Sequence, residues 1–170
     1  MKWFLLFMLT ILSGAAALAA DTQNSTALDK LKIFAGAWKS DSQNFDTIYS
    51  SAGAVSSLQT NACGHDGDFY VCNQSSNGVS RVLLVFTYKG GDTYGVTYVP
   101  ADGSRAVSGE LLIAGNTWTY PGQITKFGQV TYLRTVNVFT NPDTIEYRQE
   151  FSVDQQNWTL MAQGRETRIK

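Results

Sequence analysis

The sequence predicts a single all-β domain, an antiparallel up-and-down β-barrel of about 8–10 strands with a short N-terminal helix. Its composition is the first reason, because glycine, threonine, tyrosine and valine are frequent while only 16% of the 170 residues are charged and only 3 are proline. Such a composition is typical of strands and turns. The second reason is that short alternating segments follow one another at regular spacing, separated by turn sequences. Each junction resembles a short hairpin, which favours a meander that closes on itself over the alternative, a Greek-key sandwich.

Residues 1–19 are predicted to be a signal peptide. Lys2 provides a positive charge, an apolar run extends from Trp3 to Leu12, and small residues lead to Ala19. This arrangement is typical of a cleaved secretory signal, and the apolar run is too short for a transmembrane anchor, which needs about 20 residues. We therefore expect a periplasmic or extracellular protein. Residues 20–33 are predicted to form a polar lead-in with one short helix, and residues 34–170 the barrel.

The only two cysteines, Cys63 and Cys72, are predicted to form a disulfide, because an exported protein folds in an oxidising compartment. A hairpin turn centred on Asp66-Gly67 would place Cys63 opposite Tyr70, so direct opposition of the cysteines would require a bulge or a wider loop. Two free thiols are the alternative. Metal binding is disfavoured, because two thiols and one turn histidine make an incomplete zinc site.

The last third of the chain allows a register to be predicted. Segments 129–139 and 144–152 both alternate, and aligning their apolar faces pairs Phe139 with Thr144 and sets Arg134 against Gln149. The pairs that follow are Val138–Ile145, Val136–Tyr147 and Tyr132–Phe151. In the next hairpin the predicted pairs are Val153–Trp158, Phe151–Leu160, Gln149–Ala162 and Tyr147–Gly164.

This register leads to a candidate binding site. If the shared apolar face is the barrel interior, the Arg134 guanidinium needs partners or water there, because an isolated buried charge is costly. We expect Arg134 to meet the polar head of a small hydrophobic or amphiphilic ligand. The candidate ligand-binding residues are Arg134, Gln149, Tyr132, Tyr147, Phe151 and Trp158. The alternative is a filled barrel with an internal polar network, acting as a structural or protein-interaction module.

Catalysis is the less favoured interpretation. His65, the only histidine, lies with Asp66 and Asp68 in a predicted hairpin tip, where such residues are common. No serine or cysteine lies in a recognisable nucleophile motif, so a non-enzymatic role is predicted, with an enzyme acting at the barrel mouth as the alternative. The formal charge of −1 argues against a nucleic-acid partner. No metal or other cofactor is predicted, and a monomer is expected.

The segment from Phe34 to Lys39 contains Gly36-Ala37-Trp38 after the predicted helix, and this Gly-x-Trp pattern resembles the opening of lipocalins and other calycins. In that family the tryptophan closes the barrel floor and an arginine near the last strand packs across it. The resemblance implies structural roles for Gly36, Trp38 and Arg168, with Arg165 as the other candidate arginine. The chain also resembles a bacterial family of secreted lipocalin-like barrels of unknown function, through this pattern, the cysteine hairpin and segments 115–120 and 157–164. The ligand-carrying role of classical lipocalins is implied by analogy of fold.

Overall fold

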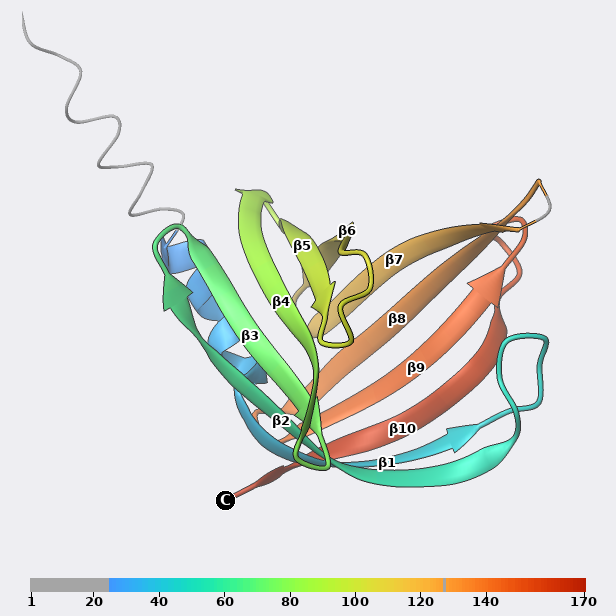
Figure 1. Cartoon of the computed structure of the whole chain (residues 1–170), viewed down its shortest axis with the longest axis horizontal. Helices are drawn as coiled ribbons and strands as arrows, with labels where there is room; N and C mark the ends of the chain where they lie inside the picture. The colour runs from blue at the N-terminus through green and yellow to red at the C-terminus, as the bar shows by residue number, and fades with distance from the viewer. Residues whose placement is uncertain (1–24, 127) are drawn as a thin grey trace, which may run out of the picture.

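Ten antiparallel strands close into a barrel in the computed structural model of this protein (Figure 1), which describes residues 25–126 and 128–170. Each strand pairs with its neighbours in sequence, and β10 closes the barrel against β1. The predicted up-and-down meander is therefore confirmed. The strands are β1 (Gly36–Asn44), β2 (Gly53–Asp66), β3 (Phe69–Ser76), β4 (Val79–Gly90), β5 (Thr93–Pro100), β6 (Val107–Ala114), β7 (Thr117–Lys126), β8 (Gln129–Asn141), β9 (Thr144–Ser152) and β10 (Thr159–Ile169). The predicted signal peptide lies outside the described residues.

A short helix closes one end of the barrel. Residues 25–28 form a helical turn that continues into the 3₁₀ helix η1 (Asp29–Phe34), which lies against β2 (Figure 1). Leu28, Leu31 and Phe34 are buried, and they join a hydrophobic core that includes Trp38 and Trp118. The described helix is too short and too polar to span a membrane. The apolar core is thus concentrated at the helix end, so the interior further along the barrel is free to be polar.

The disulfide between Cys63 and Cys72 is confirmed, and the two residues lie directly opposite each other on β2 and β3. The predicted need for a bulge or a wider loop was wrong. Asp66 pairs with Phe69, so the two-residue turn is Gly67-Asp68 and not Asp66-Gly67. Gly67 has a φ of 56°, which suits the first central position of a type II′ hairpin turn. Moving the turn by one residue brings the cysteines into register.

The predicted register between β8 and β9 was wrong by one residue. Phe139 pairs with Ile145 instead of Thr144, Arg134 lies opposite Glu150 instead of Gln149, and the register shifts between Phe139 and Asn141. An extra residue in one strand reverses which side chains share a face. The other predicted pairs on this hairpin fail for the same reason; the structure pairs Val138–Glu146, Val136–Arg148 and Tyr132–Ser152.

The hairpin formed by β9 and β10 is predicted correctly over part of its length. Gln149 pairs with Ala162 and Tyr147 with Gly164, as expected. Phe151 pairs with Thr159 and not with Leu160, because the register shifts between Leu160 and Ala162. The predicted Val153–Trp158 pair lies beyond the paired strands.

One pair of neighbouring strands separates along most of its length. β6 and β7 pair only from Leu112 to Ala114 and from Thr117 to Thr119, next to their connecting turn. β5 stays paired to β6 from Val107 onward. On the other side, β8 stays paired to β7 as far as Lys126. The wall therefore has an opening, the lateral slit, between residues 107–111 of β6 and residues 120–126 of β7.

Candidate functional site

A cavity of about 370 Å³ lies inside the barrel beside the helix-capped end and is here called the lumen. Its floor is apolar and includes Phe34, Val82 and Leu84, whereas the rest of its wall is polar. Among the described residues that line it there is no lysine, arginine or histidine, and Glu166 is the only carboxyl group. The polar lining residues are Ser40, Gln59, Gln74, Tyr98, Tyr120, Thr135, Asn137, Tyr147, Gln149 and Glu166. This lining can bind a molecule with an apolar end and a hydrogen-bonding end.

Glu166 lies on β10, between Ser40 of β1 and Ile145 of β9. Burial raises the pKa of its carboxyl group to about 7, and a hydrogen bond from Ser40 opposes that rise. Removal from water disfavours the charged form, and no described cation forms an ion pair with this carboxylate. The nearest arginine on the same strand face, Arg168, is directed elsewhere, as described below. Glu166 is therefore a partly buried carboxyl group without a counter-charge in a polar cavity.

Two tyrosines line the same cavity as this carboxyl group. Burial raises the pKa of Tyr98 on β5 to about 12. The pKa of Tyr120 on β7 is also strongly raised, first by burial and then by the proximity of Tyr98 and Glu166. Both phenols therefore stay protonated at neutral pH, and each can donate a hydrogen bond into the lumen.

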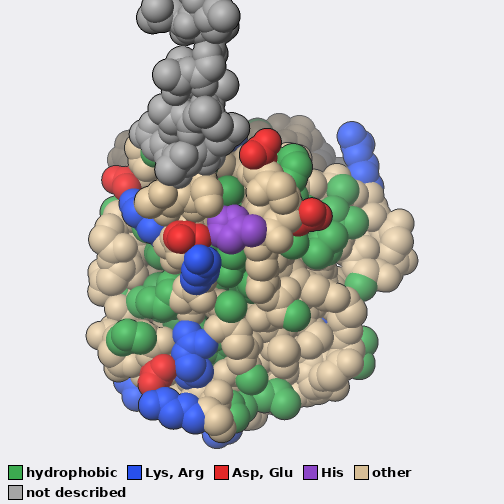
Figure 2. Space-filling model, turned by 90° about the vertical axis from the view of Figure 1, so that its left-hand side faces the viewer, with side chains coloured by type: hydrophobic (Ala, Val, Ile, Leu, Met, Phe, Trp, Pro, Cys, Tyr) green, Lys and Arg blue, Asp and Glu red, His purple; other side chains and the backbone are tan. Residues whose placement is uncertain are grey.

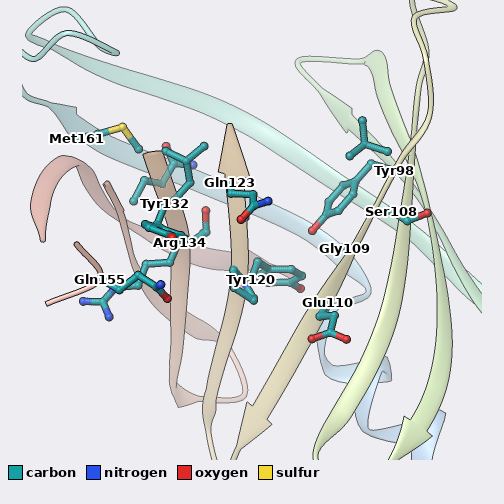
Figure 3. A pocket seen from close by; sticks show the side chains of 16 residues that line it. Tyr98, Ser108, Gly109, Glu110, Tyr120, Gln123, Tyr132, Arg134, Gln155 and Met161 are labelled. Carbon is teal, nitrogen blue, oxygen red and sulfur yellow. The ribbon is translucent and has the colours of Figure 1, made fainter. Parts of the chain in front are cut away.

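A second cavity, of about 730 Å³, lies at the lateral slit between β6 and β7 (Figure 3). Its lining includes Gly109 and Glu110 from β6 and Gln123 from β7, and we call it the lateral cleft. It shares lining residues with the lumen, so the two cavities adjoin. The shared residues are Tyr98, Tyr120, Thr135 and Gln149. The side chains of Tyr98 and Tyr120 point toward each other across the slit (Figure 3), and they stand where the cleft meets the lumen.

Arg134 does not point into the lumen, contrary to the prediction. Thr135, next to it on β8, lines the lumen, and successive side chains of a strand point to opposite faces. Arg134 therefore lies on the outer face, at the edge of the lateral cleft. There its Nε donates to the Glu150 carboxylate at 2.6 Å, and its guanidinium lies 3.8 Å from the ring centroid of Trp158. Glu150 also bonds Arg148, so the charge of Arg134 is neutralised by protein groups.

The other predicted ligand-binding residues do not form one site. Tyr147 and Gln149 do line the lumen. Phe151 packs edge-on against Tyr49 at 4.9 Å, while Tyr132 lines the lateral cleft. Trp158 stacks with Arg134 on the outer wall. Of the six candidate residues, only Tyr147 and Gln149 therefore line the lumen.

The opposite end of the barrel carries the loop between β1 and β2. Tyr49 in this loop donates a hydrogen bond from its hydroxyl group to Thr131 Oγ1 at 2.9 Å and contacts Phe151. The loop is held further by Ser50, which donates to the carbonyl oxygen of Phe45 at 2.7 Å. These contacts tie the loop across the mouth of the barrel to β8 and β9.

The residues implied by the calycin resemblance lie together at the helix-capped end. The Arg168 guanidinium stacks on the Trp38 ring, 4.1 Å from its centroid. It also donates to the carbonyl oxygens of Ala35 and Ile33. A Cβ atom at Gly36 would lie 2.6 Å from Arg168 Nη1, so only glycine leaves room for this arrangement. Arg165, the other candidate, pairs with Glu146 on the exposed surface.

His65 lies on the outer surface, beside the β2–β3 turn. Its Nε2 is 2.7 Å from Asp29 Oδ1, and Lys32 pairs with the same carboxylate. Figure 2 shows the purple histidine side chain on this face with acidic and basic groups beside it. The Asp29 carboxylate has a lowered pKa because Lys32 and His65 donate hydrogen bonds to it. These contacts attach η1 to the β2–β3 hairpin.

The candidate residues named from the sequence do not include Glu166, nor most of the other residues that line the lumen. Glu166 lies four residues after Ala162 and two before Arg168 on β10, so strand alternation puts all three side chains on one face. The signal was therefore present in the sequence. The sequence does not show which face of the strand is the interior, because that is decided only when the barrel closes.

Comparison with known proteins supports the fold. Neither a family model nor a curated protein matches the chain. Among solved structures, Rv2717c from M. tuberculosis is similar with a TM-score of 0.51 and 13% identity, over 85% of this chain and 98% of that protein. The S-type phycobiliprotein lyase CPES from Guillardia theta is similar with a TM-score of 0.57 and 12% identity, over 88% and 97% respectively. Both share the ten-stranded antiparallel barrel, which is consistent with the expected lipocalin-like, calycin-type fold.

Proposed function

We propose that this protein is exported and binds a small amphiphilic molecule in the lumen of its barrel without transforming it. The observation that carries the proposal is the cavity itself, with an apolar floor at Phe34 and Leu84 and a polar wall around Glu166. Ligand sites in proteins commonly have volumes of about 300–1,000 Å³ and combine apolar walls with a few polar groups. A filled barrel, the alternative interpretation, is disfavoured by a cavity of about 370 Å³.

The lateral slit is the proposed route into the lumen. The lateral cleft and the lumen share Tyr98 and Tyr120, whose side chains form the boundary between them. At the mouth of the barrel, by contrast, the loop that carries Tyr49 is bonded to β8. Rotation of two tyrosine side chains requires less rearrangement than release of that loop.

The chemistry of the lumen supports binding over catalysis. General acid–base work needs a group positioned to exchange a proton with substrate, and nucleophilic catalysis needs a nucleophile beside a base. Burial raises the pKa of Glu166 to about 7, so it is the one group of the described lining that can exchange a proton near neutral pH, because the tyrosines hold their protons there. The described lining has no second carboxyl group, histidine or lysine to act as its catalytic partner. The remaining polar groups of the wall are amides and hydroxyls. Such groups orient a ligand through hydrogen bonds.

Two observations support export and the family resemblance. The Cys63–Cys72 disulfide suits an oxidising compartment, as does the signal peptide predicted for residues 1–19. The stack of Arg168 on Trp38 beside Gly36 matches the arrangement that the lipocalin-like resemblance implies. We therefore place the protein, as a proposal, with secreted bacterial lipocalin-like barrels, acting as a monomer.

The test is native mass spectrometry of the protein purified from its own host. We expect a reproducible adduct in the wild type. Asn137→Phe, which enlarges a side chain of the lumen wall, should remove the adduct, whereas Arg134→Ala on the outer wall should keep it. A bare mass for the wild type would count against the proposal. Loss of the adduct in Arg134→Ala with retention in Asn137→Phe would instead place the ligand on the outer face.

A further inference from the structure

The only ionisable carboxyl group of the described lumen lining indicates which class of ligand the lumen binds. Glu166 is the only carboxyl group among the described residues that line the lumen, and none of those residues is cationic. In other parts of the described barrel, carboxylates such as Glu146 and Glu150 are paired with arginines. Glu166 therefore differs from them in having an ionisable oxygen pair directed at open space.

The polar groups around Glu166 in the lumen can form hydrogen bonds with it or with a ligand, but none of them carries a positive charge. Ser40 on β1 already donates to it, and Tyr120 on β7 is close enough for each to affect the other. Tyr98 and Tyr147, from β5 and β9, line the same cavity. From β2, β3 and β8, the facing groups are uncharged side chains, namely Gln59, Gln74, Thr135 and Asn137.

Arg168 is the one cation on the same face of β10, and it is fully occupied. It lies two residues from Glu166, but its guanidinium stacks on Trp38 and donates to backbone carbonyl oxygens, including that of Pro142. Its Nε is also 3.1 Å from Asp143 Oδ1. It is therefore held at the closed end of the barrel and does not neutralise Glu166.

We propose that the lumen binds an amphiphile with a protonated amine, with the ammonium group at Glu166 and the apolar part against Phe34, Val82 and Leu84. The inference rests on the proposed function and specifies its ligand class. An ammonium group brings three donors and a positive charge, which complement a partly buried carboxylate and the amide and phenol oxygens around it. An anionic head group would meet the same carboxylate with no cation to offset it.

The selectivity should depend on pH. Burial raises the pKa of the Glu166 carboxyl group to about 7, so the carboxylate forms as the pH rises through neutrality. An alkylamine remains protonated over the same range. The preference for an amine over a neutral ligand should therefore be small at pH 5 and full at pH 8.

The experiment compares octylamine with octanol, probes of equal chain length, by titration calorimetry. At pH 8 we expect octylamine to bind the wild type about tenfold more tightly than octanol, the size of effect of one hydrogen bond to a charged group. Glu166→Gln should abolish this preference by weakening the binding of octylamine. Glu146→Gln, which makes the same charge change on the outer surface, should keep it.

The outcomes separate this inference from the proposed function. If both probes bind equally well and Glu166→Gln changes neither, the amine inference is overturned and the binding function stands. If neither probe binds and native mass spectrometry shows a bare protein, the proposed function itself fails. Should Glu166→Gln not fold, Ser40→Ala provides a second test. Loss of the Ser40 hydrogen bond should shift the onset of the amine preference to higher pH, and an unchanged onset would contradict the inference.

Discussion

The Arg168 guanidinium lies 4.1 Å from the centroid of the Trp38 ring and holds together three parts of the chain. It reaches from the last strand to the carbonyl oxygens of Ile33 in η1 and of Ala35 after it, and to that of Pro142 in the β8–β9 turn. Trp38 Nε1 in turn donates to the carbonyl oxygen of Phe34 at 3.1 Å. Trp38 and Arg168 therefore hold the helix-capped end of the barrel closed, next to the lumen.

Arg168→Ala should destabilise the protein by about 2–3 kcal/mol, because it removes several charge-assisted hydrogen bonds and the stack on Trp38. Arg165→Ala is the matched control. Arg165 is 63% exposed and pairs only with Glu146 in the described structure, so its loss should cost less than about 1 kcal/mol. Urea unfolding of both variants checks the difference. Equal losses would show that Arg168 is not a structural clamp.

Reduction of the Cys63–Cys72 disulfide should lower the free energy of unfolding by about 2–3 kcal/mol. The bridge closes a loop with a sequence separation of 9, and restricting such a loop in the unfolded chain gives a stabilisation of this size. The measurement is urea unfolding with and without reductant, with Cys63→Ser/Cys72→Ser as the comparison for the reduced form. Reductant should have no effect on that double variant. An effect there would mean that the reductant acts on something other than the bridge.

Glu166→Gln should stabilise the free protein in a pH-dependent way. The folded-state pKa of Glu166 is raised from 4.5 to about 7, so the folded form holds this proton more tightly than the unfolded chain. The wild type consequently loses stability as the pH rises from about 4.5 to 7, by up to about 3 kcal/mol. The variant lacks this loss. The difference between the two proteins should therefore be small at pH 4 and largest at pH 8, as measured by thermal unfolding across pH.

Glu146→Gln is the control for that pH series, because Glu146 lies on the surface with Arg165. It should give no stabilisation at pH 8. A Glu166→Gln difference that is equally large at pH 4 would show that packing, and not the titration of the carboxyl group, is responsible.

Gly109→Leu should slow ligand binding and release without a matching change in affinity. A Cβ atom at Gly109 would lie 3.5 Å from Tyr98 Cε2, an ordinary contact, and would stand at the lateral slit. A leucine there should hinder the movement of Tyr98, so both rate constants for octylamine should fall severalfold in stopped-flow fluorescence. Gly53→Leu, at an exposed position with open space around it, is the control. Unchanged rates in Gly109→Leu would indicate that the ligand passes through the mouth of the barrel.

The architecture could be predicted from the sequence because it rests on local signals. Short alternating segments and glycine-rich turns determine hairpins. A series of hairpins forms a sheet with two unpaired edge strands, and these pair with each other when the barrel closes. The disulfide followed from the number of cysteines and the expected compartment. Two of the three candidate residues on β9, Tyr147 and Gln149, line the lumen, and their role in binding stays a prediction.

The interior face of β8 could not be predicted in the same way. The pattern of β8 predicts that its more apolar face, with Val136 and Val138, points inward. In the structure Thr135 and Asn137 line the lumen, and the register shift after Phe139 reverses the faces. A polar cavity inverts the usual pattern of apolar side chains inside, and a bulge of one residue leaves no clear mark on the alternation.

The sequence alone therefore determined the strands, most of their order and the covalent link between β2 and β3, because these depend on residues near one another in the chain. Only the tertiary structure decided that Arg134 lies outside and Glu166 inside. Which face of a strand becomes the interior depends on the summed registers of all ten strands around the closed barrel, and a single inserted residue in one of them exchanges the two faces.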